Sequence, residues 1–481
     1  MKNIKVNMLI NSLKSLLSIL FPLITFPYVS RVLGVENIGK YNYATSIVSY
    51  FVFFAGLGIF NYAIREGSRI KDDKEKIQKF SSEIFTINLL SSTIAYVLLI
   101  ICMFLFHKLL NYYDLLIILS LPIILNAIGK EWYFTIYEEY GYLTIRYIVF
   151  QIITLILMFL FVKQKGDYIT YAIITVVASS GANVLNYLKI RKKVNIKLTL
   201  NVIHLKPILY FFASSLAVFI YTNTDVAILG GFWGDYEVGI YSVSVKVYTI
   251  IVSLLSAAIS SLIPRMAMYS KDYKLNSKKM NDLACETFCI IILLMFPIMA
   301  GITSLSKEII LLIAGDSFVS AIFSVDVLAI AAAFCIFGYF FGNAILIIFN
   351  REKFVLKTTI YAAIINIVLN FVLIPNFKQD AAAITTLISQ AVSCFILAKE
   401  GLKYVDLRTT YKTFLHSITG TSFILLIIQI LRLFNMNLYI FIMLSIILSI
   451  IVYLIILVKL KNRVVLNILR EINSKIKSKN I

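Results

Sequence analysis

The stretch MLINSLKSLLSILFPLITFPYV, residues 8–29, decides the fold class, because it holds a single charged side chain, Lys14. A helix of about 20 apolar residues is long enough to cross the roughly 30 Å hydrocarbon core of a bilayer. The stretch therefore predicts a membrane-spanning helix.

Similar apolar stretches recur along the whole chain. Of the 481 residues, 60% are hydrophobic and only 15% are charged, whereas a soluble domain is about half apolar and a quarter charged. We therefore predict an all-α integral membrane protein with about fourteen transmembrane helices. After residues 8–29 the stretches cover 41–63, 84–106, 115–132, 147–162, 168–188, 208–230, 238–263, 288–305, 327–349, 355–374, 381–397, 414–433 and 438–458.

A short internal repeat divides these helices into groups. ENIGKY (residues 36–41) follows the first stretch, and YEVGIY (residues 236–241) follows the seventh. A preceding Leu-Gly pair occurs in both places, Leu33-Gly34 and Leu229-Gly230. Because transporters are often built from duplicated bundles, we predict an N-lobe of six helices (1–200) and a C-lobe of six (201–400). A helix pair with a basic cytoplasmic tail (401–481) closes the chain.

The net charge of +20 is distributed unevenly between alternate loops. One side of the predicted membrane carries most of the 45 Lys and Arg, including the N-terminus and the tail. The positive-inside rule makes this side cytoplasmic, so we expect a multi-pass protein of the cell membrane with both termini in the cytoplasm. These cations would contact anionic membrane lipids, and a nucleic-acid partner is not expected.

Motifs for catalysis or metal binding are not found in the sequence. The three His are isolated and the five Cys fall in or beside apolar stretches, so no zinc-ligand cluster, nucleophile triad or nucleotide-binding loop is recognised. We expect no catalytic residues, no metal and no cofactor, and predict that the chain is not an enzyme. Coupling to protons or sodium stays open.

Polar residues share one face of the first helix, at helical spacing. They include Asn11, Lys14, Ser15 and Ser18. Since a charge within the bilayer is costly, this face is expected to meet water or protein. Lys14 can either line a cavity or extend to the inner head groups.

The eighth helix carries the clearest polar stripe in the sequence. Ser242, Lys246, Thr249, Ser253 and Ser256 step by four, three, four and three residues along one face. Small residues in such a stripe permit close helix packing. The lysine at its outer end favours the wall of a hydrated cavity instead.

Two further charged residues fall in or near the predicted membrane region. Asp225, in the seventh helix, is expected at a depth similar to Lys246, so the two can form a structural ion pair or part of a substrate or ion site. Arg31 follows the first helix toward the outside, where positive charge is scarce; an ordinary interface arginine is the alternative.

Three blocks of sequence resemble the Wzx-type polysaccharide and O-antigen repeat-unit flippases of the multidrug/oligosaccharidyl-lipid/polysaccharide (MOP) exporter superfamily. They are FPLITFPYVSRVLGVENIGKYNYATSIVSYF (21–51) followed by YAIRE (62–66), EWYFTIYEEYGYLTIR (131–146) and YTNTDVAILGGFWGDYEVGIYSVSVKVY (221–248). The resemblance implies a MATE-like fold with two lobes around a central cationic cavity. It places Arg31, Arg65, Asp225 and Lys246 at matching positions.

The resemblance also implies a cargo and a direction of transport. The cargo would be an undecaprenyl-pyrophosphate-linked oligosaccharide, moved by alternating access from the cytoplasmic to the outer leaflet for O-antigen, capsule or exopolysaccharide biosynthesis. A polysaccharide polymerase and a chain-length regulator would be its partners. Phosphates need positive charge and sugars need hydroxyls along the path, which Lys14, Lys246, Arg31 and the serine stripes would supply.

Two alternatives remain open. A cation-coupled multidrug efflux transporter of the same superfamily would use buried carboxylates, but Lys14 stands in the first helix and related exporters' first-lobe acid has no counterpart. A membrane polysaccharide polymerase would place a large catalytic loop outside, where the predicted loops are short.

Overall fold

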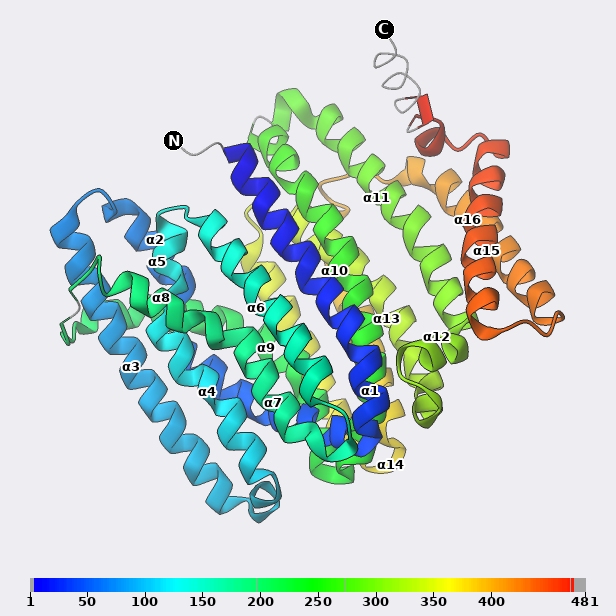
Figure 1. The fold of residues 1–481 in the computed structure, drawn as a ribbon. Helices are drawn as coiled ribbons and strands as arrows, with labels where there is room; N and C mark the ends of the chain where they lie inside the picture. The colour runs from blue at the N-terminus through cyan, green and yellow to red at the C-terminus, as the bar shows by residue number, and fades with distance from the viewer. Residues whose placement is uncertain (1–3, 196, 272, 468, 471–481) are drawn as a thin grey trace, which may run out of the picture. The chain divides into compact units, whose positions relative to one another are not determined.

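The computed structural model describes residues 4–195, 197–271, 273–467 and 469–470 of the chain. The side chains of 4–16, 19, 214, 221, 271 and 273–275 lie outside this description. Within it the chain is helical, with α-helices joined by short 3-10, π and loop segments, and it contains no strand (Figure 1). The predicted all-α fold is confirmed.

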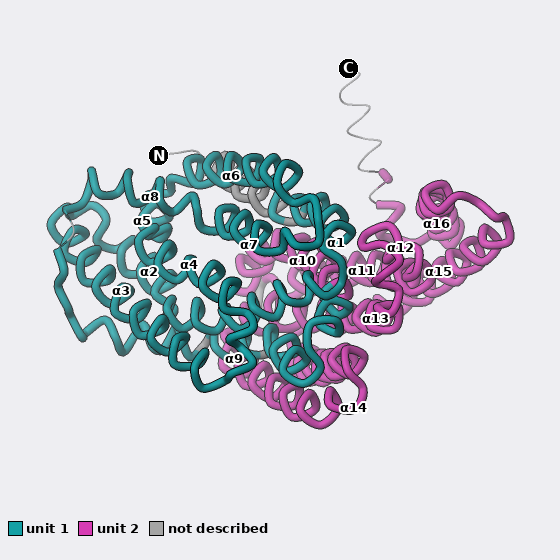
Figure 2. The backbone as a smooth tube through the Cα atoms, turned by 60° about the horizontal axis from the view of Figure 1, so that its bottom comes forward, with its two compact units in different colours: residues 1–242 teal, residues 243–481 magenta. Residues whose placement is uncertain are grey.

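Two compact units make up the chain, residues 1–242 and 243–481 (Figure 2). The compact units divide the chain within the helix that covers residues 235–271. The lobe boundary near residue 200 stays a prediction. The first unit contains α1 (Ile4–Gly56), α2 (Ile59–Ile70), α3 (Lys74–Leu105), α4 (Tyr113–Gly129), α5 (Glu131–Ile136), α6 (Tyr140–Phe161), α7 (Tyr168–Val176), α8 (Ala182–Ile190), α9 (Leu205–Trp233) and the start of α10 (Asp235–Lys271).

The second unit contains the rest of α10 and the remaining helices. These are α11 (Tyr273–Ser304), α12 (Ser306–Ile313), α13 (Ile322–Tyr339), α14 (Glu352–Gly401), α15 (Tyr411–Arg432) and α16 (Leu438–Lys459). Two π-helical segments interrupt the α-helices, η3 (Val177–Gly181) in the first unit and η6 (Phe340–Leu346) in the second.

Among the described residues, 11 helical segments are long and apolar enough to cross a membrane. Two of them are kinked at a residue with non-helical dihedral angles, Gly34 in α1 and Lys378 in α14, so each is long enough for two crossings. Together with the 29 residues of α9, the described part of the chain accommodates the fourteen crossings predicted from apolar stretches. Large apolar side chains on the outer faces, such as Phe104 and Leu105 (both 70% exposed), suit contact with lipid.

Each unit has its own apolar core. In the first, buried residues of α2, α3 and α5 form one cluster, which includes Ile59, Phe80 and Trp132. In the second, α11, α15 and α16 form another, which includes Leu293, Ile424 and Tyr453.

Candidate functional site

The internal repeat forms a close helix crossing inside the first unit. A Cβ atom added at Gly39 would lie 1.7 Å from the carbonyl oxygen of Asp235, and one added at Gly239 would lie 2.1 Å from that of Val35. Each repeat glycine therefore faces the backbone of the other repeat, an approach that only residues without a side chain permit. The repeat seen in the sequence is thus a contact in the structure.

The helix breaks correct the register of this repeat. Gly34 (φ 74°) ends the first part of α1, and Gly234 (φ 84°) separates α9 from α10. Both lie five residues before the crossing glycines, so the counterpart of Gly34 is Gly234 and not Gly230. Gly230 instead packs against the ring of Tyr43, which lies 2.1 Å from where its Cβ would be.

Asp225 lies on α9 and is 9% exposed. The hydroxyl of Tyr241 donates a hydrogen bond to its Oδ2 at 3.2 Å. One residue earlier, Thr224 accepts a hydrogen bond from the hydroxyl of Tyr50 at 3.2 Å. Asp225 belongs to the first unit and Lys246 to the second, so the pairing of these two residues stays a prediction.

The polar stripe on α10 uses its hydroxyls within its own helix. Ser242 donates to the carbonyl of Gly239 (2.6 Å), Thr249 to that of Val245 (2.6 Å) and Ser256 to that of Ser253 (3.3 Å). Lys246, Ser253 and Ser256 are half-buried, and Thr249 is exposed. Hydroxyls satisfied in this way suit both a packed face and a wetted one, so both interpretations of the stripe stay open.

The two predicted arginines lie in different settings. Arg31 is exposed, and its Nη1 donates to the carbonyl of Pro27 at 2.9 Å. Arg65 lies on α2 with 48% of its side chain exposed and forms an ion pair with Glu66 at 2.9 Å. Its guanidinium carbon also lies 5.0 Å from the ring centre of Phe211. A partly exposed guanidinium can still donate hydrogen bonds to an anionic group.

Three of the predicted residues on the first helix, Asn11, Lys14 and Ser15, have side chains outside the described part of the structure. Ser18 is described and exposed. The polar face of the first helix therefore stays a prediction.

The second unit contains an apolar groove that was not predicted from the sequence. The groove has a volume of about 540 Å³ and lies among α11, α15 and α16. Aliphatic side chains such as Leu294, Ile446 and Leu454 line it, with Ser445, Ser449 and Tyr453 as its polar members. Ser445, Ser449 and Tyr453 are spaced four residues apart, so they share one face of α16. This spacing is the feature of the sequence that could have identified the face of α16 toward the groove.

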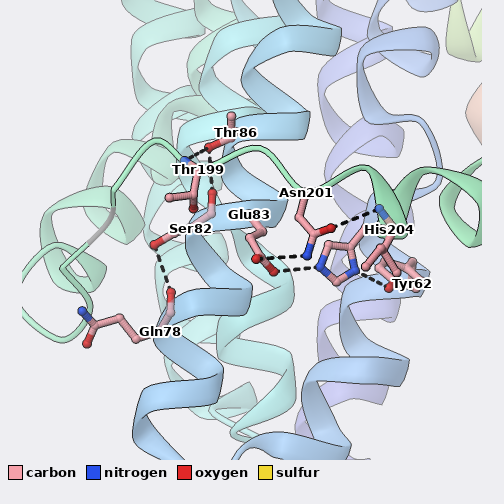
Figure 3. A network of polar contacts seen from close by, with 9 residues as sticks. Tyr62, Gln78, Ser82, Glu83, Thr86, Thr199, Asn201 and His204 are labelled. Atoms are coloured by element: carbon pink, nitrogen blue, oxygen red, sulfur yellow. Dashed lines mark hydrogen bonds and ion pairs between the residues drawn. The ribbon is translucent and has the colours of Figure 1, made fainter.

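A hydrogen-bonded connection between α8 and α9 was also missed. The Nε2 of His204 lies 2.9 Å from Oε2 of Glu83, its Nδ1 lies 2.6 Å from the hydroxyl of Tyr62, and Asn201 donates to the other Glu83 oxygen at 3.1 Å (Figure 3). The backbone amide of Thr199 donates to the hydroxyl of Thr86 at 3.0 Å. We call residues 197–204 the strap, because side chains of α3 hold it along that helix.

Solved structures identify the fold. The chain is similar to "Lipid II flippase MurJ, inward closed conformation", with a TM-score of 0.73 and 17% identity over 93% of this chain and 98% of that one. It is also similar to an inward-facing multidrug resistance MATE family transporter of the MOP superfamily, with a TM-score of 0.62 and 16% identity over 82% of this chain and 95% of that one. The chain shares the fold of these two solved structures.

The family follows from sequence. A profile described as "Polysaccharide biosynthesis protein" matches residues 4–270. The chain belongs to the polysaccharide biosynthesis protein family, as the resemblance predicted. It is 25% identical over 392 residues to the "Putative O-antigen transporter" of Escherichia coli (strain K12), covering 78% of this chain and 90% of that protein.

A second curated relative comes from an archaeon. The chain is 25% identical over 202 residues to the "Probable low-salt glycan biosynthesis flippase Agl15" of Haloferax volcanii, covering 42% of each protein. These relatives are transporters and flippases, in agreement with the prediction that the chain is not an enzyme.

Proposed function

We propose that this protein moves an undecaprenyl-pyrophosphate-linked oligosaccharide from the cytoplasmic to the outer leaflet by alternating access, for the biosynthesis of a cell-surface polysaccharide. Both the family and the names of the relatives support a glycan flippase. The cargo has a long apolar tail, an anionic pyrophosphate and a polar sugar, and the protein has to accommodate all three.

The apolar groove of the second unit is the observation that carries the proposal. Its lining is almost entirely aliphatic, and an apolar chain gains about 0.8 kcal/mol for each CH₂ group that it buries. A prenyl chain suits such a groove.

The pyrophosphate needs cations, which Lys14, Arg31, Arg65 and Lys246 would supply in turn. Asp225 would neutralise Lys246 when no cargo is bound. The serine hydroxyls on α10 would contact the sugar.

The export of polysaccharide in the native host tests the function. In a strain that lacks the chromosomal copy, Lys14→Ala and Lys246→Ala should each abolish surface polysaccharide at normal protein levels, and Lys246→Arg should retain part of it. Full export in both alanine variants would refute the proposed path. If the protein instead confers resistance to cationic drugs and its loss leaves surface polysaccharide unchanged, the protein is a cation-coupled efflux transporter.

The proposed orientation places both termini in the cytoplasm of a bacterial cell. In a variant without the five native cysteines, Lys74→Cys should react with a membrane-impermeant maleimide only in permeabilised cells. Asn111→Cys should react in intact cells. The reverse pattern would mean the opposite orientation.

A further inference from the structure

A second cavity lies wholly within the first unit, apart from the groove and from the cationic residues discussed above. It has a volume of about 300 Å³ and is lined by the end of α1 and by α2, α3, α4, α5 and α8. Ligand pockets have volumes of about 300–1,000 Å³, so this cavity is at the lower limit of that range. The side chains that give it polar character are Asn88, Asn126, Asn183 and Glu131, and Trp132 and Phe60 give it aromatic character.

A chain of hydrogen bonds fixes one wall of this cavity. Asn183 donates from Nδ2 to Oδ1 of Asn126 at 2.9 Å, and Arg146 donates from Nη1 to Oδ1 of Asn183 at 3.3 Å. Arg146 also forms an ion pair with Glu131 at 2.9 Å, although its side chain is only 7% exposed. A buried cation held by two partners is a rigid anchor for the carboxamides around it.

The backbone around this wall is built to bring the carboxamides together. The π-helical segment Val177–Gly181 directly precedes α8, whose second residue is Asn183, and such segments frequently occur at functional sites. Ser180 within it also donates to Oδ1 of Asn126, at 3.4 Å. Gly129 allows the end of α4 to approach, since its Cβ would lie 2.5 Å from the side chain of Asn183.

Hydrogen-bonding capacity remains unused in the cavity. Within the described part of the chain, the carboxamide of Asn88 and the Nδ2 of Asn126 have no hydrogen-bond partner, although both residues line the cavity. The Nε of Arg146 is buried and also unpartnered there. Asn88 is half-buried and Asn126 is exposed, so both carboxamides are accessible and can donate to and accept from a polar occupant of the cavity.

The donor set favours a neutral hydroxyl-bearing ligand over an ion. Both terminal nitrogens of Arg146 are occupied by Asn183 and Glu131, and the ion pair has no net charge, so a phosphate would gain little. The described residues contain no group of three or more His, Cys, Asp or Glu placed to hold a metal ion. A carboxamide both donates and accepts, as a sugar hydroxyl does, and the rings of Trp132 and Phe60 offer apolar surface to the carbon face of a sugar.

We propose that this first-unit cavity binds a single neutral sugar ring of the transported glycan. The proposal rests on the proposed function for the source of the sugar, but the binding itself is measurable without transport. The ring would be held by Asn88 and Asn126 against Trp132.

The protein carries its own reporter for this site. Of its two tryptophans, Trp132 lines the cavity and Trp233 ends α9, so in a Trp233→Phe background the emission reports the cavity. Purified full-length protein in detergent is titrated with free glucose, galactose and N-acetylglucosamine. At least one sugar should produce a saturable change in emission.

Variants connect the signal to the carboxamides. Asn88→Ala and Asn126→Ala should each weaken sugar binding by about 2- to 10-fold, which corresponds to the loss of one hydrogen bond. Asn376→Ala, at an exposed asparagine of the second unit, should leave the titration unchanged. If either cavity variant fails to fold, the titration of the Trp233→Phe protein still decides the question.

The outcomes separate this inference from the proposed function. No response to any sugar, or a response to NaCl with none to sugars, would overturn the cavity proposal. If Lys246→Ala still abolishes export in that case, the flippase proposal stands. Sugar binding that depends on Asn88, combined with full export in Lys14→Ala and Lys246→Ala, would support the cavity and refute the cationic path.

Discussion

Gly39 and Gly239 lie against each other's chain segments, two hundred residues apart in sequence, and leave no room for a side chain. We expect Gly39→Ala to lower the free energy of unfolding by about 1–3 kcal/mol, because the new methyl group would overlap the carbonyl of Asp235. Gly231→Ala is the matched control, since nothing lies within 4 Å of its added Cβ. Thermal unfolding in detergent measures both, and equal melting temperatures would contradict the close crossing.

Lys130 should make stability depend on pH. The residue follows α4, is 1% exposed, and its Nζ lies 3.7 Å from the ring centre of Phe85. Burial lowers the pKa of Lys130 from 10.5 to about 7. Between these values the unfolded chain binds a proton that the folded chain does not, so the free energy of unfolding rises with pH through this window.

Lys130→Met removes that ionisable group. We expect the free energy of unfolding of the variant to exceed that of the parent by about 1–3 kcal/mol at pH 7. This difference in unfolding free energy should become smaller as the pH rises toward 10.5. Melting curves from pH 6 to pH 10 measure it, with exposed Lys192→Met as control. A variant less stable than the parent at pH 7 would show that the ammonium is stabilised where it lies.

Glu83 should hold the strap in place. Glu83→Ala removes the acceptor of both His204 and Asn201 and leaves their polar groups unpaired, at a cost of about 1–3 kcal/mol. Trypsin should then cleave after Lys197 faster than in the parent. Gln78→Ala loses only an exposed hydrogen bond of 3.3 Å to the carbonyl of Asn195 and should change the rate little. Equal rates for the two variants would mean that the Glu83 contacts do not restrain the strap.

The apolar groove can be filled from one side of α16. Ile446 lines the groove, and the neighbouring Ile447 is similarly exposed without lining it. If a prenyl chain occupies the groove, Ile446→Trp should reduce polysaccharide export several-fold at normal protein levels, and Ile447→Trp should not. Normal export in Ile446→Trp would remove the groove from the transport path.

The helices could be predicted from the sequence because membrane-spanning segments depend mainly on the length and polarity of local stretches. The register of the repeat was predicted wrongly, since one Leu-Gly pair ends at Gly34 and another at Gly230. The positive φ angles of Gly34 and Gly234 show that these two glycines are the counterparts. The burial of two charged side chains could not be predicted from the sequence either. Lys130 and Arg146 are both buried. The sequence does not show this, because the side chains that contact them, Phe85 and Asn183, come from other helices.

The candidate sites show the same limit. Asn88, Asn126 and Asn183 lie on three different helices with no common spacing, so their convergence on one cavity depends on tertiary packing. The residues of the proposed cationic path can be selected from the sequence as charges in or near predicted membrane segments. The groove, in contrast, depends on the arrangement of α11, α15 and α16.

The strap also determines where this protein accepts an added domain. A fluorescent protein or affinity tag inserted between α8 and α9 would have to displace a segment whose backbone and side chains are bound to α3, so we expect such fusions to express poorly. The turn between α15 and α16 is different, because Leu433 and Phe434 are 81% and 58% exposed. Insertions tolerate exposed turns best, which makes residue 435 the better position for a reporter that leaves the transporter intact.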